Sequence, residues 1–405
     1  MELRFTEEET AFRQEVRDFI RTSLPSHISE RLRLGYPPTK QDVVTWQRIL
    51  NRKGWATYKW PKEYGGCDWS PAQRMIFQDE NLLGHAPEVN SFNITMIGPV
   101  LIQFGTPAQK ERFIARCANL DDWWCQGFSE PGSGSDLASL KTAAVRNGDE
   151  YVVNGQKIWT STAHHADWIF ALVRTNPQAR KPQEGISFLL IDMKTPGITV
   201  RPIISIDGSH HFNEVFFDNV RVPVSQRVYE ENKGWDVAKF LLGNERTGIA
   251  RLGKSLARLH DMRELAPQLR AHGGSLLDDP GFRERIAALE VRAKALEITQ
   301  LRVVSKMMQK SDGKPDPFSS LLKIKGSELN QDTSEMVMDA VGPLAMPDWA
   351  RELDKLSSEG SNDPRIGPDW AGYAAAPYLM HRASTIAGGT TEIQKNILNK
   401  AVLRL

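Results

Sequence analysis

The chain has 405 residues, of which 51 are basic and 50 acidic, so its formal net charge at pH 7 is +1. This balance excludes a global field that would attract nucleic acid or an anionic membrane, and the length allows a large core divided among two or three units. The first residues are acidic and lack the apolar segment of a signal peptide, and no apolar run approaches the roughly 20 residues of a membrane span. Three cysteines without a Cys-x-x-Cys pair fit a reducing compartment. We therefore expect a cytoplasmic protein without nucleic-acid or membrane partners.

The first part of the chain carries repeated helix-start signals. Thr6 and Thr39 each begin a capping box, in which an acidic side chain follows three residues later. Ser70 and Thr106 are each followed by proline, which suits the first position of a helix because its missing N–H has no partner there. Gly54 is placed to end the second helix. The pattern predicts an α-helical segment.

In the middle of the chain, apolar residues change from helical spacing to alternation, which indicates β-strands. Asn147-Gly148 separates two such runs and suits the positive φ values of a hairpin turn, and Asn154-Gly155 repeats the turn signal. Further strands are predicted at Trp168–Val173, Ile186–Ile191, Ile198–Ile204 and Val215–Phe217.

Helical spacing of apolar residues resumes at Trp235 and continues through several long segments, which indicates a helical bundle. We therefore expect an α+β fold with three domains. These are an N-terminal helical domain at residues 1–120, a middle β domain at residues 121–230 and a C-terminal helical bundle at residues 231–405.

The segment Gln126-Gly-Phe-Ser-Glu-Pro-Gly-Ser-Gly-Ser-Asp136 joins the predicted helices to the predicted strands. It contains three glycines, three serines and two carboxylates within eleven residues, so it cannot continue a helix or a strand. Glycine permits positive φ values and a close approach of the backbone to a ligand. The composition is typical of a ligand-binding loop, and the alternative is an ordinary surface connection.

Four other stretches combine with this loop into an ordered set of motifs. They are Gly54-Trp-Ala with Trp60-Pro-Lys-Glu-Tyr-Gly-Gly66; Val153-Asn-Gly-Gln-Lys-Ile-Trp-Thr-Ser161; Glu214-Val-Phe-Phe-Asp-Asn-Val-Arg-Val-Pro223; and Gly388-Gly-Thr-Thr-Glu-Ile-Gln394. On these residues the chain resembles the acyl-CoA dehydrogenase family. The resemblance implies that the middle β domain is antiparallel and that the C-terminal domain is a four-helix bundle.

The resemblance also implies an FAD cofactor, because no protein side chain accepts the hydride that such a reaction releases. Phe128 and Ser129 correspond to residues that donate to the pyrimidine end of the flavin, and Ser135 to one that reaches the pyrophosphate. Trp159 and Ser161 correspond to residues beside the flavin ring. Taken alone, Trp159 would be interpreted as a core aromatic residue, and the resemblance reverses that interpretation. Thr390 and Glu392 correspond to contacts with the ADP half.

The position of the catalytic base departs from one common family pattern. Many members carry a glutamate directly before the Gly-Thr of the C-terminal motif, where this chain has Gly388. Other members carry the base near the start of the C-terminal bundle, and the matching residue here is Glu245, flanked by apolar residues that would raise its pKa. Arg246 is a candidate substrate contact, and the Gly388 backbone a candidate donor to the thioester oxygen. Without the resemblance, Glu245 and Arg246 would be interpreted as a solvated helix patch.

The implied reaction removes the α-proton of an acyl-CoA and transfers the β-hydride to flavin N5, giving a trans-2-enoyl-CoA as in β-oxidation of fatty acids. Dicarboxylyl or steroid side-chain CoA esters are candidate substrates, and an electron-transfer flavoprotein is the implied acceptor. The alternatives are a flavin monooxygenase or oxidase of the same fold, and a non-catalytic subunit that completes a partner's flavin site. The latter would have lost the Ser129 and Ser161 loops, which this chain retains.

Two family sequences that bind the ADP portion of a neighbouring subunit's FAD are missing. Arg-x-x-Phe-Gly is replaced by Arg270-Ala-His-Gly-Gly-Ser275, and Gly-Gly-x-Gly by Asp339-Ala-Val-Gly-Pro-Leu-Ala345, where Pro343 removes a backbone donor. The resemblance therefore implies a paralogous small subunit and an α2β2 heterotetramer, as in the large subunits of heteromeric bacterial enzymes such as pimeloyl-CoA dehydrogenase. Misalignment of this divergent region is the competing explanation.

Two adjacent histidine pairs, His164-His165 and His210-His211, raise the question of a metal site. Neighbours on a strand point to opposite faces, and no cysteine or carboxylate at ligand spacing completes a set. We expect polar loop histidines and no metal.

Overall fold

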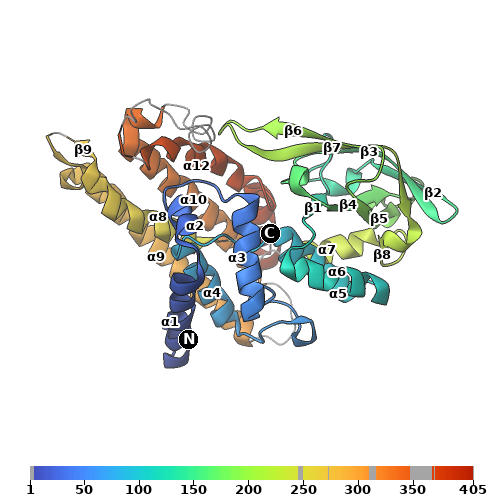
Figure 1. Ribbon diagram of the computed structural model, residues 1–405, viewed down its shortest axis with the longest axis horizontal. Helices are drawn as coiled ribbons and strands as arrows, with labels where there is room; N and C mark the ends of the chain where they lie inside the picture. The colour runs from blue at the N-terminus through green and yellow to red at the C-terminus, as the bar shows by residue number, and fades with distance from the viewer. Residues whose placement is uncertain are drawn as a thin grey trace.

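The computed structural model describes residues 4–244, 250–271, 273–309, 316–346, 367–368 and 370–404. The strands lie together at one side of the molecule, with a few helices beside them. Most of the other helices pack together at the other side (Figure 1). The α+β fold class predicted from the sequence is confirmed. None of the described helices is both long enough and apolar enough to cross a membrane.

The N-terminal helices begin where the capping signals predict. Thr6, Thr39, Ser70 and Thr106 each accept a hydrogen bond at the side-chain oxygen from the backbone N–H three residues later, and Gly54 ends its helix with φ of 79°. The helices are α1 (Glu7–Ser23), α2 (Ser26–Arg33), α3 (Lys40–Lys53), α4 (Pro71–Leu83), α5 (Gly98–Phe104) and α6 (Pro107–Asn119), with a wider π-helical turn at Phe92–Ile97.

The middle of the chain forms one mixed, mainly antiparallel sheet. Its strands are β1 (Trp124–Gly127), β2 (Ala143–Asn147), β3 (Glu150–Lys157), β4 (Trp168–Arg174), β5 (Ile186–Asp192), β6 (Ile198–Ile204), β7 (His210–Pro223) and β8 (Arg227–Val228). Their order is β6-β7-β3-β2-β4-β5-β8, and β1 pairs in parallel with β4. The hairpin predicted at Asn147-Gly148 joins β2 to β3.

Strand β4 is buried on both faces, which explains why its sequence is continuously apolar. Trp168, Phe170 and Leu172 face the core that the sheet shares with α5, α6 and the following helix α7 (Gly234–Asn244). Ile169, Ala171 and Val173 face the second core, on the β3 and β7 side. Figure 1 shows α5, α6 and α7 together beside this sheet.

Two strand predictions are corrected. Asn154-Gly155 is not a turn; it lies inside β3, where the register with β7 shifts between Val153 and Gly155. Gly155 has φ of 151°, and a Cβ atom there would lie 2.6 Å from Thr142 Oγ1, so this position needs glycine for a bulge instead of a turn. Strand β7 also extends well beyond the predicted Val215–Phe217 in both directions.

The C-terminal part is built from long helices packed on one another. They are α8 (Leu252–Leu265), α9 (Pro280–Gln309), α10 (Ser319–Val341), α12 (Ala375–Met380) and α13 (Thr391–Leu398), with a small hairpin of β9 (Arg270–Ala271) and β10 (Gly274–Ser275). The apolar faces of α8, α9 and α10 form one core, and α13 packs against α10. Helix α4 of the N-terminal part packs against both α8 and α9.

Helix α1 is attached to α4 by a buried carboxylate. Glu80 is 3% exposed and accepts hydrogen bonds from Arg17 Nε at 2.6 Å and Arg17 Nη2 at 3.1 Å, while Arg13 Nε lies 3.2 Å away. Because the carboxylate is shielded and its arginines remain partly exposed, the bidentate pair fixes the crossing of the two helices.

We predict that Glu80→Ala lowers the free energy of unfolding by about 2 kcal/mol, because it removes the acceptor of a shielded charge-assisted pair. Asp18→Ala is the control, since Asp18 pairs with Arg21 at the surface with 46% of its side chain exposed; its effect should stay within about 0.5 kcal/mol. Urea unfolding monitored by circular dichroism measures both. Equal effects of the two substitutions would contradict this role of Glu80.

Candidate functional site

The loop that follows β1 starts at a point of close packing. A Cβ atom on Gly127 would lie 2.8 Å from Ile169 Cδ1, so glycine lets the chain pass close to β4 without displacing that side chain. The next side chain, Phe128, is buried, with its ring centroid 6.0 Å from that of Phe170 and 6.3 Å from that of Phe188. The Phe128 side chain therefore anchors the start of the loop in the sheet core, and the Phe128 backbone lies at the edge of that core.

Beneath the loop lies a buried ion pair. Lys157, the last residue of β3, has no exposed surface; its Nζ donates to Glu130 Oε1 at 2.7 Å and to the Phe128 carbonyl at 3.2 Å. The Glu130 carboxylate also accepts the backbone N–H groups of Lys141 at 2.6 Å and Thr142 at 2.9 Å. One salt bridge thus joins the loop, the start of the β2 hairpin and the end of β3.

The pKa values of this pair follow from its surroundings. Burial lowers the pKa of Lys157 to about 8, although the neighbouring Glu130 opposes the shift. Burial alone would raise the pKa of Glu130, but Lys157 and the hydrogen bonds from Thr142 and Lys141 outweigh burial and hold the pKa below its ordinary value. The carboxylate is therefore ionised at neutral pH and the ammonium mostly so.

The segment after β3 lies against the loop. The Ser129 carbonyl accepts the Ile158 N–H at 2.9 Å, and the next residue, Trp159, has φ of 59°, which is uncommon for a bulky residue. Its indole is 58% exposed and meets Phe212 of β7 edge-on, with ring centroids 5.9 Å apart. Hydrogen bonds between Thr160 and Asn213 in both directions hold this conformation. A large flat ring is thereby presented to the outside.

Four of the residues predicted from the sequence gather around this point. Phe128 and Ser129 are joined to the Trp159 segment by the Ser129–Ile158 hydrogen bond, and Ser161 follows two residues later. In the described part of the chain, neither the Ser129 nor the Ser161 hydroxyl has a hydrogen-bond partner. Ser135 is exposed near the end of the loop. The group offers a flat aromatic face beside free hydroxyls, which suits a planar, polar ring.

The predicted C-terminal motif forms a tight turn before α13. Gly388 and Gly389 have φ of 65° and 88°, and Thr390 caps α13 by accepting the Ile393 N–H at 3.2 Å. Glu392 is exposed in the first turn of that helix. Among the described residues, no hydrogen bond, ion pair or ring contact joins this turn to the β-domain loops. Within the described chain, the two groups of predicted site residues are therefore not joined by a direct interaction.

Glu245 and Arg246 lie outside the described residues. The described chain resumes at Ala250, and a Cβ atom on Gly326 of α10 would lie 2.4 Å from the Ala250 carbonyl oxygen. Gly326 therefore permits the chain before α8 to approach α10 closely.

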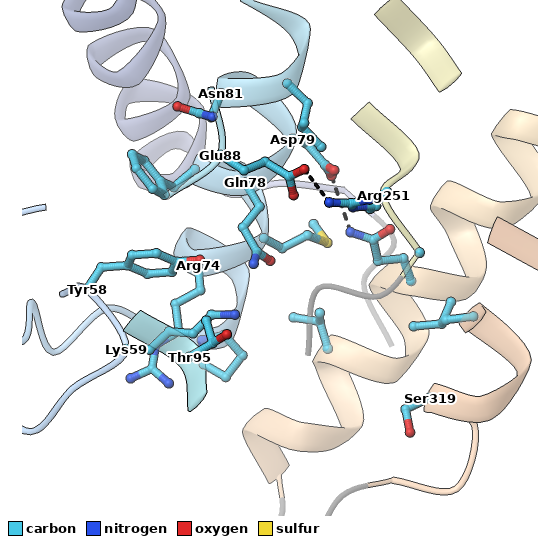
Figure 2. Close-up of a pocket in the computed structure, with 18 of the residues that line it drawn as sticks. Tyr58, Lys59, Arg74, Gln78, Asp79, Asn81, Glu88, Thr95, Arg251 and Ser319 are labelled. Atoms are coloured by element: carbon cyan, nitrogen blue, oxygen red, sulfur yellow. Dashed lines mark hydrogen bonds and ion pairs between the residues drawn. The ribbon is translucent and has the colours of Figure 1, made fainter. Parts of the chain in front are cut away.

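A cavity of about 180 Å³ lies where α4, α9 and the starts of α8 and α10 meet. Figure 2 shows its lining side chains converging from these helices. Apolar residues including Met75, Phe77, Val89, Val303 and Leu322 form part of the wall, and Ala250 and Arg251 lie at one side.

Polar side chains form the smaller part of the cavity wall. Arg251 pairs with Glu88, and Asp79 accepts the Gly253 N–H and Gln300 Nε2, each at 3.2 Å. Burial raises the pKa of Asp79 to about 7, even though the Gly253 N–H opposes the shift. These polar groups offer points of contact that a cavity for a plain alkyl chain does not require. The sequence did not reveal these residues, because they come from separate segments of the chain and none belongs to a recognisable motif.

The two histidine pairs lie next to each other in the structure. The His164 ring lies 4.0 Å from that of His165 and stacks on that of His210 at 3.9 Å. Asn213 lies within hydrogen-bond distance of both His164 Nδ1 and His210 Nε2. No group of three or more potential metal ligands was found among the residues that the structure describes.

Family models match almost the whole chain. The model described as Acyl-CoA dehydrogenase, N-terminal domain, matches residues 6–121, that of the middle domain matches residues 125–220, and that of the C-terminal domain matches residues 232–403.

Individual relatives agree with these models. Acyl-CoA dehydrogenase IpdE1 of Mycobacterium tuberculosis is 35% identical over 97% of both chains, and acyl-CoA dehydrogenase FadE26 of the same organism is 32% identical over 100% of this chain and 99% of the relative. The solved ChsE4-ChsE5 complex from Mycobacterium tuberculosis has a chain with a TM-score of 0.81 at 31% identity, covering 100% of this chain and 99% of that one. The Tcur3481-Tcur3483 steroid ACAD has a TM-score of 0.84 at 27% identity, with the same coverage.

The buried pair beneath the loop predicts a specific acid dependence. Because the folded pKa of Glu130 is lower than the ordinary 4.5, its contribution to stability is present above that pH and is lost as pH falls through the folded pKa. Glu130→Gln should be less stable at neutral pH and should lose less further stability between about pH 5 and pH 3.5. Urea midpoints across this range measure the difference. The control is Glu8→Gln, at an exposed position of α1. If wild type and Glu130→Gln lost equal stability across this pH range, the assignment would be contradicted.

Proposed function

This chain belongs to the acyl-CoA dehydrogenase family, and we propose that it is the FAD-binding, catalytic chain of an enzyme that converts an acyl-CoA into a trans-2-enoyl-CoA. The observation that carries the proposal is the outward-facing Trp159, held in a strained conformation beside Ser129 and Ser161. A bulky residue held in a sparsely populated backbone conformation, with its ring exposed, marks a candidate ligand site. FAD, when bound, supplies a hydride acceptor at its N5 atom.

The residues present fit this cofactor. The Trp159 ring offers a stacking face, and the Ser129 and Ser161 hydroxyls, without partners in the described chain, are available to polar atoms of the flavin. The backbone around Phe128 and Ser129 would donate to the pyrimidine end, where charge develops on reduction. Ser135, exposed in the loop, would approach the pyrophosphate. Thr390 and Glu392 at the start of α13 would contact the ADP half, in a site assembled between chains.

We assign the removal of the α-proton to Glu245. Apolar neighbours in sequence and the binding of a thioester would dry the carboxylate and raise its pKa toward the value that a general base needs. The Gly388 backbone would donate to the thioester oxygen and stabilise the developing enolate, while Arg246 would contact the substrate or tune the base. The proton passes to Glu245 and the β-hydrogen leaves as hydride, so that a carbon–carbon double bond forms.

The acyl tail would occupy the cavity between α4 and the C-terminal helices. Ala250 and Arg251, which line it, follow Glu245 by five and six positions, so the cavity begins close in sequence to the proposed base. The polar side chains in this mainly apolar wall favour a substrate with oxygen functions in its tail, such as a dicarboxylyl or steroid side-chain CoA ester. The steroid ACAD among the similar structures supports this substrate range. We expect the enzyme to act in the cytoplasm and to pass electrons to an electron-transfer flavoprotein.

A paralogous partner chain would complete the flavin site. Helix α10 ends at Gly342, whose φ is 58°, and the short turn Gly342–Ala345 follows, with Pro343 in place of a backbone donor. The other altered sequence forms the small β9–β10 hairpin, of which His272 lies outside the described residues. The similar structures include the ChsE4-ChsE5 complex and the Tcur3481-Tcur3483 steroid ACAD, whose names each join two proteins. These features support an α2β2 assembly.

The proposal predicts that Glu245→Gln slows reduction of the bound flavin by an acyl-CoA about a thousandfold under anaerobic conditions, because general-base catalysis contributes about 10² to 10⁴ in rate. The dissociation constant of the acyl-CoA should change much less. Stopped-flow absorbance of the flavin measures the rate, and Glu264→Gln, on the exposed face of α8, is the control. A rate within about threefold of wild type would exclude Glu245 as the base.

A further inference from the structure

The charged side chains that line the cavity differ in whether an interaction partner satisfies them. Six charged side chains line it: Lys59, Arg74, Asp79, Glu88, Arg251 and Asp316. The three carboxylates each have an identified donor. Glu88 accepts from Arg251, Asp79 from the Gly253 N–H and Gln300, and Asp316 from the Phe318 N–H at 2.9 Å.

Arg74, in the first turn of α4, is the exception. It is half-buried, its Nε atom is shielded from solvent without an acceptor, and no hydrogen bond or ion pair of this guanidinium was found within the described ranges. A shielded donor that has lost its water without gaining an acceptor costs free energy. The Ser319 hydroxyl and the Gln300 Oε1 atom, which also line the cavity, are likewise buried without a partner. These atoms indicate that the cavity is built for a ligand with polar atoms.

The end of the cavity at Arg74 is positively charged. Lys59 lies close enough that burial first, and then the charge of Arg74, lowers the pKa of its ammonium to about 8. Figure 2 shows Lys59 and Arg74 together on the Tyr58 side, whereas Arg251 and Asp79 lie on the other side. Two adjacent cations attract an anion more strongly than a neutral oxygen.

We orient the substrate with its reacting end on the side of Arg251, which follows the proposed base by six positions in the sequence, so that its tail extends toward Arg74. A plain alkyl tail would place its terminal methyl group against the guanidinium and leave the donor without an acceptor. A carboxylate would accept two parallel N–H bonds from it.

We propose that Arg74 is a specificity-determining residue that binds a carboxylate at the far end of the acyl group, so that the substrate is a CoA ester bearing a distal carboxylate. This inference rests on the proposed function and selects among the substrates which that function allows. Lys59 adds to the positive potential of the same corner.

The test compares substrates on the flavin-loaded enzyme in its native assembly. Dicarboxylyl-CoA esters of six to ten carbons are compared with straight-chain acyl-CoA esters and with distal methyl esters of the same chain lengths. The measured quantity is the kcat/KM of each dicarboxylyl ester divided by that of its neutral counterpart. We expect a preference of at least about tenfold for one or more dicarboxylyl esters over both neutral series. Arg74→Met should reduce this ratio by about 10- to 100-fold, mainly through KM, and Arg74→Lys should retain part of it because it keeps the charge without the bidentate geometry.

Arg52→Met, at the exposed end of α3, is the matched control for loss of an arginine, and flavin content and thermal midpoint verify that each variant is folded. A wild-type enzyme that shows no preference for any dicarboxylyl ester, or that uses the methyl esters equally well, would overturn the inference while leaving dehydrogenation intact. An Arg74→Met ratio equal to wild type would overturn it as well. Failure of every CoA ester to reduce the flavin would instead contradict the proposed function.

Discussion

The buried salt bridge between Lys157 and Glu130 determines the geometry of the β-domain site. It lies under the loop with no exposed surface on the lysine, and its three other hydrogen bonds go to backbone groups of the loop and of the β2 hairpin. Two shielded charges stabilise a structure only when both are present and their remaining hydrogen-bonding capacity is satisfied. Because this condition is met, the backbone of Phe128 and the outward Trp159 segment are held at fixed positions on either side of the pair.

The proposed reaction depends on two different parts of the structure. The β domain supplies a rigid, flat edge, where a strained backbone and free hydroxyls face outward toward a planar ring. The helices supply an enclosed space, which is bounded by α4 from the N-terminal part and by α8, α9 and α10 from the C-terminal part. A substrate that spans both regions would be oriented at two points, and this orientation brings the reacting carbons to one place. The substrate tail is then recognised by side chains remote from the chemistry.

The sequence allowed many of the helices and strands to be predicted, for reasons that are local, and it named Phe128, Ser129, Trp159 and Ser161, which the structure brings together. Capping side chains such as Thr6 and Thr106 act within one turn, and the Asn147-Gly148 turn acts between adjacent residues, so their effects are visible in the sequence alone. The same dipeptide at Asn154-Gly155 forms a bulge because Thr142 of a neighbouring segment approaches it, and no local rule contains that contact. The cavity was not predictable for the same reason, because the proposed role of Arg74 depends on Lys59 and on the α9 residues that line the same cavity. Glu245 remains a prediction from the family resemblance.

The most direct test of the account is the ratio of FAD to protein in this chain purified alone, compared with the chain co-expressed with a paralogous partner. The account predicts little flavin in the isolated chain and about one FAD per pair of chains in the mixed complex, because Pro343 and the altered hairpin leave one half of the site to the partner. One FAD bound to each isolated chain would contradict the shared site and assign the complete cofactor site to copies of this chain.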